Sequence, residues 1–168
     1  MPSLNSLYPI SWTKIETYLN CPLVYKHKYI IKDIPWVETD AIRWGNAVHK
    51  AMELNLTEQK PLEGRFLFLN PLADKLNAMP GDHYAETELA IDRALLPVGY
   101  WDHDCWARGK MDRTVLQGSI GYSFDYKSGK HKAEFSHQLS LAAVFVFATW
   151  PQLDRLGVAY LWTQGGKP

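Results

Sequence analysis

The 168-residue sequence contains no apolar run long enough to cross a lipid bilayer. Its longest strongly apolar stretch, residues 139–150, falls short of the roughly 20 residues that a spanning helix needs. Residues 1–7 lack the basic stretch, apolar core and small-residue cleavage site of a secretory signal. We therefore expect a cytoplasmic protein that has no membrane partner.

Cysteine is scarce, and neither sign of charge is in excess. Cys21 and Cys105 can form one bridge at most, so we expect no disulfide framework and two reduced thiols. The 18 Lys and Arg residues balance the 18 Asp and Glu residues. This balance excludes the sequence-wide basic field by which many nucleic-acid-binding proteins are recognised.

The composition that remains is that of an ordinary globular protein. Apolar residues make up 46% and charged residues 21% of the chain, which excludes a disordered chain, a coiled coil and collagen. A length of 168 residues is close to that of one typical domain. We therefore expect a single domain over residues 1–168.

Capping spacing and hydrophobic periodicity predict the secondary structure. Thr13 and Glu16 have the spacing of a capping box, with Ser11 as a competing N-cap, and a second short amphipathic helix follows from Pro22 to about residue 31. Further helices are predicted over residues 39–56 (capped by Thr39 or Asp40, with Trp44, Val48 and Met52 at four-residue spacing), 72–78 and 136–148. Strands are predicted over residues 84–92, 106–116, 120–127 and 157–163. This order predicts an α/β fold with a central mixed sheet flanked by helices.

The predicted strand 120–127 carries an acid and an amine on one face. Side chains alternate along a strand, so Asp125 and Lys127 share one face while Phe124 and Tyr126 share the other. A carboxylate able to bind a cation then lies beside a lysine able to reach an anion or activate water. An exposed ion pair on an edge strand explains the same segment equally well.

The predicted strand 106–116 places Arg108, Lys110 and Asp112 on one face by the same alternation. A second carboxylate from a neighbouring strand is what a shared metal site needs, because hard divalent cations prefer several oxygen ligands. Arg108 and Lys110 suit phosphate oxygens. Taken alone, a polar strand face is the simpler interpretation.

In the predicted helix 39–56, Gly45, His49 and Glu53 recur every four residues and form one stripe. Glycine in a helix interior costs about 1 kcal/mol relative to alanine, which indicates that another part of the chain approaches closely there. His49 is a credible metal ligand if this helix packs against the two Asp-bearing strands. Otherwise it is a structural histidine at the edge of the core.

Together these segments resemble the RecB-like nucleases of the PD-(D/E)XK superfamily. The family's Gly-x-x-x-His-x-x-x-Glu helix, Arg-Gly-x-x-Asp strand and Asp-Tyr-Lys-[Ser/Thr]-Gly strand are matched by residues 45–53, 108–112 and 125–129. Gln138 matches the first residue of a helical Gln-x-x-x-Tyr motif, but Ala142 stands in the tyrosine position. The helix therefore lacks the tyrosine of the family's DNA-contacting motif.

Two weaker features fit the same family. Residues 21–25 match its N-terminal Cys-Pro-x-x-Tyr segment, and Glu86 falls in the strand that carries a supporting glutamate, with Glu88 on the same face as the alternative. Some members bind an iron–sulfur cluster through one early and three late cysteines. Here no cysteine follows Cys105, so we expect no cluster.

The resemblance implies a restriction-endonuclease-like core and a site for Mg²⁺ or Mn²⁺, with Mn²⁺ at least as effective because manganese tolerates nitrogen ligands better. The implied metal ligands are His49, Asp112, Asp125 and the carbonyl of Tyr126. Lys127 would act on the attacking water or the transition state, Glu86 would support the site, and Gln138 would orient the lysine or the substrate. Arg108, Lys110 and Lys130 would bind the substrate.

The activity implied by the resemblance is metal-dependent hydrolysis of DNA phosphodiester bonds. We expect an exonuclease of recombination, repair or phage DNA processing that acts on single- or double-stranded DNA ends in a bacterial or phage-infected cell. A partner protein or a homo-oligomer stays open. Two alternatives also stay open: a catalytically silent nucleic-acid-binding or protein-interaction module, and a hydrolase of small phosphoesters.

Overall fold

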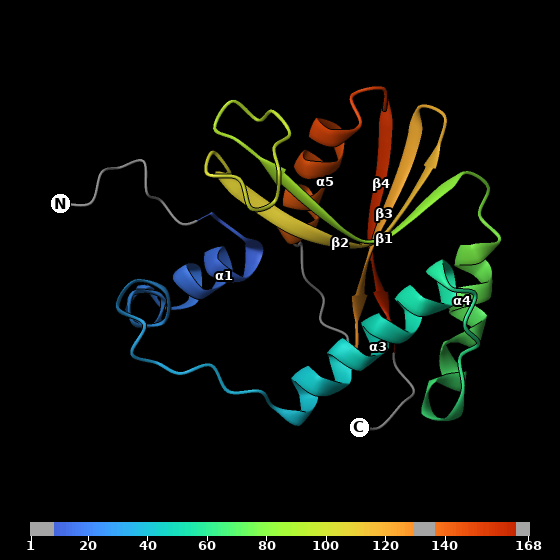
Figure 1. The fold of residues 1–168 in the computed structure, drawn as a ribbon, viewed down its shortest axis with the longest axis horizontal. Helices are drawn as coiled ribbons and strands as arrows, with labels where there is room; N and C mark the ends of the chain where they lie inside the picture. The colour runs from blue at the N-terminus through green and yellow to red at the C-terminus, as the bar shows by residue number, and fades with distance from the viewer. Residues whose placement is uncertain (1–8, 130–136, 164–168) are drawn as a thin grey trace.

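Four strands form one sheet in the computed structural model, which describes residues 9–129 and 137–163 (Figure 1). Lys130 lies outside these residues. The strands are β1 (Asp82–Ile91), β2 (Ala107–Gln117), β3 (Ile120–Lys127) and β4 (Arg155–Trp162), in the spatial order β1-β2-β3-β4. β1, β2 and β3 pair antiparallel, whereas β3 and β4 pair parallel. The mixed sheet predicted from the sequence is confirmed.

Helices pack on both sides of this sheet (Figure 1). One side carries α3 (Asp40–Thr57), the 3₁₀ helix η3 (Gly64–Leu69) and α4 (Asn70–Asn77), which form a core with Tyr126 of β3. The other side carries α5 (His137–Thr149), which forms a second core with β1 and β2. Among the described residues, no helix combines the length and apolar character that crossing a bilayer requires.

α3 follows the sequence pattern closely. Thr39 caps it, because its hydroxyl accepts a hydrogen bond from the amide of Ile42 at 3.3 Å. Trp44, Val48 and Met52 recur every four residues, and their side chains are buried in the core that α3 shares with Tyr126 of the sheet. The expected close approach at the glycine of α3 is also present, since a Cβ on Gly45 would lie 3.3 Å from the hydroxyl of Ser128.

The antiparallel hairpin of β2 and β3 opens at one end. Its pairing stops at Arg113 and Phe124, although β2 begins earlier and β3 runs on to Lys127. Beyond that point β3 pairs only with β4, as far as Lys127 opposite Trp162. The opening leaves space between the two strands that carry the predicted acids.

At the open end of this hairpin, the side chains of β2 also stop alternating between the two faces of the sheet. Asp112 contacts His49 of α3 and the next residue, Arg113, donates to the carbonyl of Leu76 in α4, so two consecutive side chains reach the same group of helices. On β1, Glu86 stands opposite Asp112 in the register and has a left-handed backbone, with φ of 49°. Such a conformation costs a non-glycine residue of order 1–3 kcal/mol.

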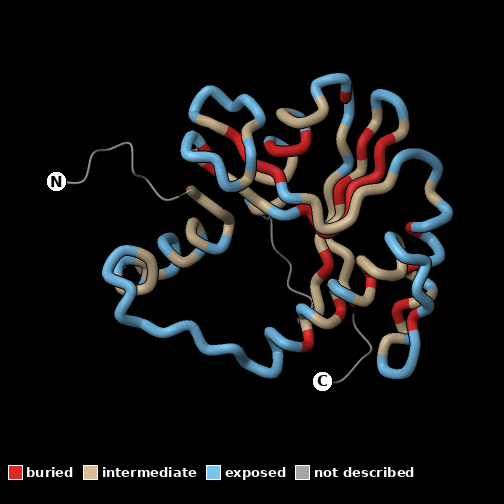
Figure 2. The backbone as a smooth tube through the Cα atoms, viewed as in Figure 1, coloured by how far each residue is buried: buried red, intermediate tan, exposed pale blue. Residues whose placement is uncertain are grey.

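The N-terminal helices follow the prediction in part. α1 (Trp12–Asn20) has Ser11, the alternative to the Thr13 capping box, as its N-cap residue, although the Ser11 side chain makes no cap hydrogen bond. Residues 22–31 are helical, but as α2 (Pro22–Tyr25) followed by the π-helix η2 (Lys26–Ile31). Figure 2 shows no buried residue on these helices, so their apolar faces have no core to pack against.

One further helix and the start of one strand also differ from the prediction. The 3₁₀ helix η3 was not predicted, because its run of Phe and Leu residues is too short to show helical periodicity. β4 begins at Arg155, before the predicted start at Gly157, because parallel pairing with β3 already starts at Ile120 opposite Arg155. The helix predicted over 136–148 is α5, and residue 136 lies outside the described residues.

The core under α5 generates a stability prediction. Phe145 is 1% exposed, and a Cβ on Gly109 would lie 2.8 Å from its ring, so the phenyl group fills the space above β2. Phe145→Ala is expected to lower the free energy of unfolding by about 3–5 kcal/mol. The matched control is Phe147→Ala, because Phe147 of the same helix is 40% exposed. Urea denaturation measures both, and equal losses would contradict this packing.

Candidate metal centre and catalytic pocket

Three elements bring one imidazole and two carboxylates together. His49 of α3, Glu86 of β1 and Asp112 of β2 each offer a ligand atom, and these atoms lie within 4.8 Å of one another. The Nδ1 atom of His49 is 3.3 Å from Oδ1 of Asp112 and 3.4 Å from Oε1 of Glu86. The helix therefore does pack against an Asp-bearing strand, as the metal-ligand interpretation of His49 requires.

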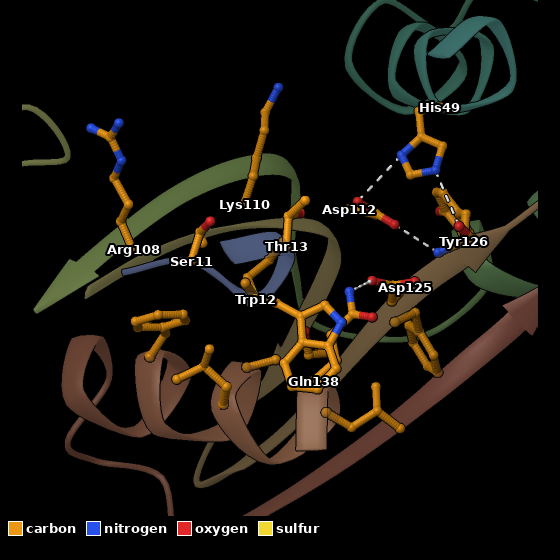
Figure 3. A pocket seen from close by; sticks show the side chains of 18 of the residues that line it. Ser11, Trp12, Thr13, His49, Arg108, Lys110, Asp112, Asp125, Tyr126 and Gln138 are labelled. Atoms are coloured by element: carbon orange, nitrogen blue, oxygen red, sulfur yellow. Dashed lines mark hydrogen bonds and ion pairs between the residues drawn. The ribbon is translucent and has the colours of Figure 1, made fainter. Parts of the chain in front are cut away.

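Tyr126 of β3 closes this cluster through its backbone. Its amide donates a 2.6 Å hydrogen bond to Oδ2 of Asp112, and its carbonyl oxygen is 3.1 Å from Nε2 of His49 (Figure 3). The phenol ring of Tyr126 is buried in the core under α3, as strand alternation predicted. The main chain of β3 thus takes the place beside Asp112 where regular pairing has stopped.

The charges around His49 control its protonation. Burial lowers its pKa, but the hydrogen bonds and negative charges of Asp112 and Glu86 outweigh burial and raise the pKa to about 10. Burial raises the pKa of Glu86, yet His49 and Lys110 have the larger combined effect and lower it. In the absence of a metal, the cluster is therefore an imidazolium paired with carboxylates.

A second group of side chains lies beside the first. Lys127 is 2.6 Å from Oδ2 of Asp125 and donates to Oε1 of Gln138 at 3.1 Å. Gln138 donates to Oδ1 of Asp125 at 2.6 Å, so acid, amine and amide form a closed ring of contacts. Tyr160 of β4 also donates its hydroxyl to Oε1 of Gln138 at 3.2 Å, and Lys127 lies 4.8 Å from the centre of its ring.

Asp125, predicted as a metal ligand, therefore points to Lys127 and Gln138 and is not one of the three clustered ligand residues. It remains electrostatically coupled to them. Burial and the negative charge of Asp112 raise the pKa of Asp125, and the opposing effect of Lys127 is smaller. A cation near both carboxylates would remove this repulsion.

The residues present fit a hard divalent cation. Oε1 of Glu86 is buried, and its contact among the described residues is the 3.4 Å ion pair with Nδ1 of His49, which leaves most of its capacity to accept unused. An imidazole, two carboxylates and a carbonyl are ligands that Mn²⁺ and Mg²⁺ accept. His49, Glu86 and Asp112, with the carbonyl of Tyr126 beside them, could hold such an ion.

Members of both groups line one pocket of about 450 Å³: His49 and Asp112 of the first, and Asp125, Lys127 and Gln138 of the second (Figure 3). Two of the predicted substrate-binding residues, Arg108 and Lys110, line it as well. Lys110 pairs with Oε2 of Glu86 at 2.9 Å, whereas Arg108 packs its guanidinium against the rings of Tyr100 and Trp101. Eight of the ten residues predicted for the site therefore line this pocket, whereas Glu86 does not and Lys130 lies outside the described residues.

Residues outside the pocket lining agree with the sequence expectation in part. Glu86, the preferred of the two glutamates, is in the cluster, and Glu88 is exposed. Glu53, the last member of the helix stripe, pairs with Lys50 outside the cluster. Tyr160 was missed, since only the register that places it opposite Asp125 identifies it. Cys21 and Cys105 are free thiols.

The protonation of His49 generates a prediction. In the metal-free protein its imidazole is expected to lose its proton only near pH 10, because Asp112 and Glu86 stabilise the cation. The stabilisation from this contact is present in full below pH 6.5 and is lost as the pH rises through about 10. Asp112→Asn is expected to lower the His49 pKa. An NMR titration of the imidazole protons, assigned with His49→Gln, measures this; titration near pH 6.5 would contradict the geometry.

Two comparisons with known proteins bear on this geometry. The search of curated protein sequences found no match. The family model described as the PD-(D/E)XK nuclease superfamily matches residues 9–167, almost the whole chain. The four-stranded mixed sheet flanked by helices is consistent with the restriction-endonuclease-like fold of that superfamily, and the cluster of His49, Glu86 and Asp112 fits the metal dependence that membership implies. The chain therefore belongs to the PD-(D/E)XK nuclease superfamily.

Proposed function

We propose that the protein is a RecB-like deoxyribonuclease that hydrolyses DNA phosphodiester bonds with Mg²⁺ or Mn²⁺ and acts as an exonuclease on DNA ends. One observation carries the proposal: His49 and Asp112 of the acid and imidazole cluster line the same pocket as the Asp125–Lys127–Gln138 group. A nuclease needs both, because one group must hold a cation and the other must act on water or on the phosphate.

The residues proposed to hold the cation are His49, Glu86 and Asp112, with the carbonyl of Tyr126. Asp125 would join them after turning away from Lys127, since the charge of Asp112 already acts on it. A bound Mg²⁺ or Mn²⁺ supplies Lewis-acid polarisation of the phosphate and lowers the pKa of a bound water. Oε1 of Glu86 has only the 3.4 Å contact with His49 among the described residues, and it would accept a cation once His49 has lost its proton.

Lys127 is the proposed catalytic lysine. Asp125 and Gln138 hold its ammonium group at one point of the pocket, at 2.6 and 3.1 Å, and Gln138 is itself held by Tyr160. An ammonium fixed in this way can orient the attacking water or stabilise the negative charge that develops on the phosphate. Once Asp125 has turned to the cation, Gln138, itself held by Tyr160, is left to position Lys127.

Arg108 and Lys110 are proposed to bind the DNA backbone, together with Lys130. Arg108 and Lys110 lie on one face of β2, about 6.6 Å apart along the strand, and Asp112 follows at the same spacing. The strand would therefore present two cations in line with the cluster.

We further propose that residues 1–168 act as one nuclease domain in recombination, repair or phage DNA processing in the cytoplasm.

The nuclease assay is the direct test. End-labelled single- and double-stranded DNA is incubated with the protein and Mg²⁺ or Mn²⁺, with cleavage expected for both metals. Asp112→Ala and Lys127→Ala are each expected to reduce the rate at least 100-fold, since each removes a group that acts on the reacting atoms. Lys50→Ala is the matched control, because Lys50 pairs with Glu53 on the exposed side of α3. Wild-type cleavage no faster than that of Lys127→Ala would refute the proposal.

A second candidate function is a catalytically silent nucleic-acid-binding or protein-interaction module. It is favoured by Ala142, which lines the pocket where the family has a tyrosine, and by the ion pair that Asp125 makes with Lys127. A silent module keeps the fold without needing the cation.

Metal titration separates the two candidates. Calorimetry with Mn²⁺ is expected to show binding that His49→Gln weakens at least tenfold, and release of about one proton per ion at pH 7.5, because the imidazole must lose its proton to bind. His27→Gln is the matched control, since His27 pairs with Asp33 on the N-terminal helices. Binding that does not depend on His49 would favour the silent module.

A further inference from the structure

The pocket extends beyond the groups used for hydrolysis. Its remaining lining comes from the start of α1, from the strand start at Arg108 and Gly109, and from the first turns of α5. The side chains there that carry no proposed chemistry include Trp12, Leu139, Leu141, Ala142 and Phe145. This part of the pocket is therefore mainly apolar and adjoins the catalytic lysine through Gln138.

Trp12 is fixed in this pocket by the backbone that precedes it. Ile10 makes a parallel bridge with Ala107, with Ile10 N donating to the carbonyl of Trp106 at 2.8 Å and its carbonyl accepting from Arg108 N at 2.8 Å. The first turn of α1 is thereby attached to the start of β2. Figure 3 shows the indole of Trp12 projecting into the pocket on the side of Gln138.

Two small residues, Ala142 and Gly109, leave space at the bottom of the pocket. Ala142 lines it where a larger side chain would project from α5, and Gly109 allows the ring of Phe145 to lie directly against β2. A pocket of about 450 Å³ falls in the range that takes a small ligand, roughly 300–1,000 Å³. It is too small to enclose a DNA duplex, in which a base must leave the stack before it can enter a pocket.

A fixed cation lies at the rim. The guanidinium of Arg108 is 4.7 Å from the ring centre of Tyr100 and 4.2 Å from that of Trp101, and it donates to the carbonyl of Tyr100 at 2.9 Å. Arginine held on aromatic rings is positioned for a phosphate without further ordering. An aromatic face, an apolar floor and a cation at the rim are the elements that bind a base and its phosphate.

We infer that this part of the pocket binds one unpaired nucleobase of the strand being cut, stacked on Trp12 above Ala142, with a neighbouring phosphate on Arg108. The inference rests on the proposed nuclease function and specifies its substrate as single-stranded DNA or a frayed end. A strand that stays paired cannot place a base in the pocket.

The test compares two labelled probes by fluorescence anisotropy in EDTA, where a metal-dependent enzyme does not cut them. One is a thymidine pentanucleotide and the other is a pentamer of abasic sugar-phosphate units with the same charge. The wild-type protein is expected to bind the thymidine probe more tightly. Trp12→Ala is expected to weaken that binding roughly 5- to 100-fold and to leave the affinity for the abasic probe unchanged.

A second variant protects the test against misfolding. Ala142→Leu fills the floor of the pocket and is expected to weaken binding of the thymidine probe in the same way, with thermal unfolding and Mn²⁺ binding as checks on the fold. Trp36→Ala is the matched control, because Trp36 is 66% exposed and is not among the pocket residues.

Equal affinity of the wild-type protein for the two probes, or no binding of either, would overturn the inference. So would a Trp12→Ala variant that binds the thymidine probe as well as the wild type does. Cleavage with Mg²⁺ or Mn²⁺ is measured separately. If the pocket does not bind a base, cleavage is still expected with Mg²⁺ or Mn²⁺. If the protein is not a nuclease, tighter binding of the thymidine probe is still expected in EDTA.

Discussion

The buried carboxylate of Asp112 is the point at which the parts of the molecule that carry chemistry meet. One of its oxygens accepts the amide of Tyr126 and the other faces the imidazole of His49, so a single side chain connects β2, β3 and α3. A buried carboxylate is tolerated only when it is paired or hydrogen-bonded. This requirement holds the opened hairpin in a defined shape and fixes where the helix passes over it.

Much of the fold and of the site could be predicted because local pattern and tertiary contact agree there. The repeat of Trp44, Val48 and Met52 predicts the buried face of α3, and His49 is then placed toward the sheet without further information. Strand alternation is equally reliable where the strands are regular. It places Asp125 and Lys127 on one face, and the structure has them in contact.

The rest depends on contacts that no local pattern encodes. Tyr160 reaches Gln138 only because β4 runs parallel to β3 in one particular register. The sequence register already favours Glu86 over Glu88, but a regular strand does not predict the left-handed backbone at Glu86. The N-terminal segment has an amphipathic pattern, yet its helices bury no residue, since a pattern does not show whether a core is available.

Glu86 combines two features that oppose folding: a left-handed backbone in a residue with a side chain, and a buried carboxylate oxygen whose contact with His49, at 3.4 Å, is too long for a good hydrogen bond. A sequence selected only for thermostability would place glycine there, because glycine adopts that backbone without steric cost and carries no charge to bury. Glutamate at this position lowers the folding stability and places a negative charge at one point of the sheet. Stability and activity are therefore expected to change in opposite directions at this position, and variants recovered by a screen for heat resistance alone would lose the function of the pocket.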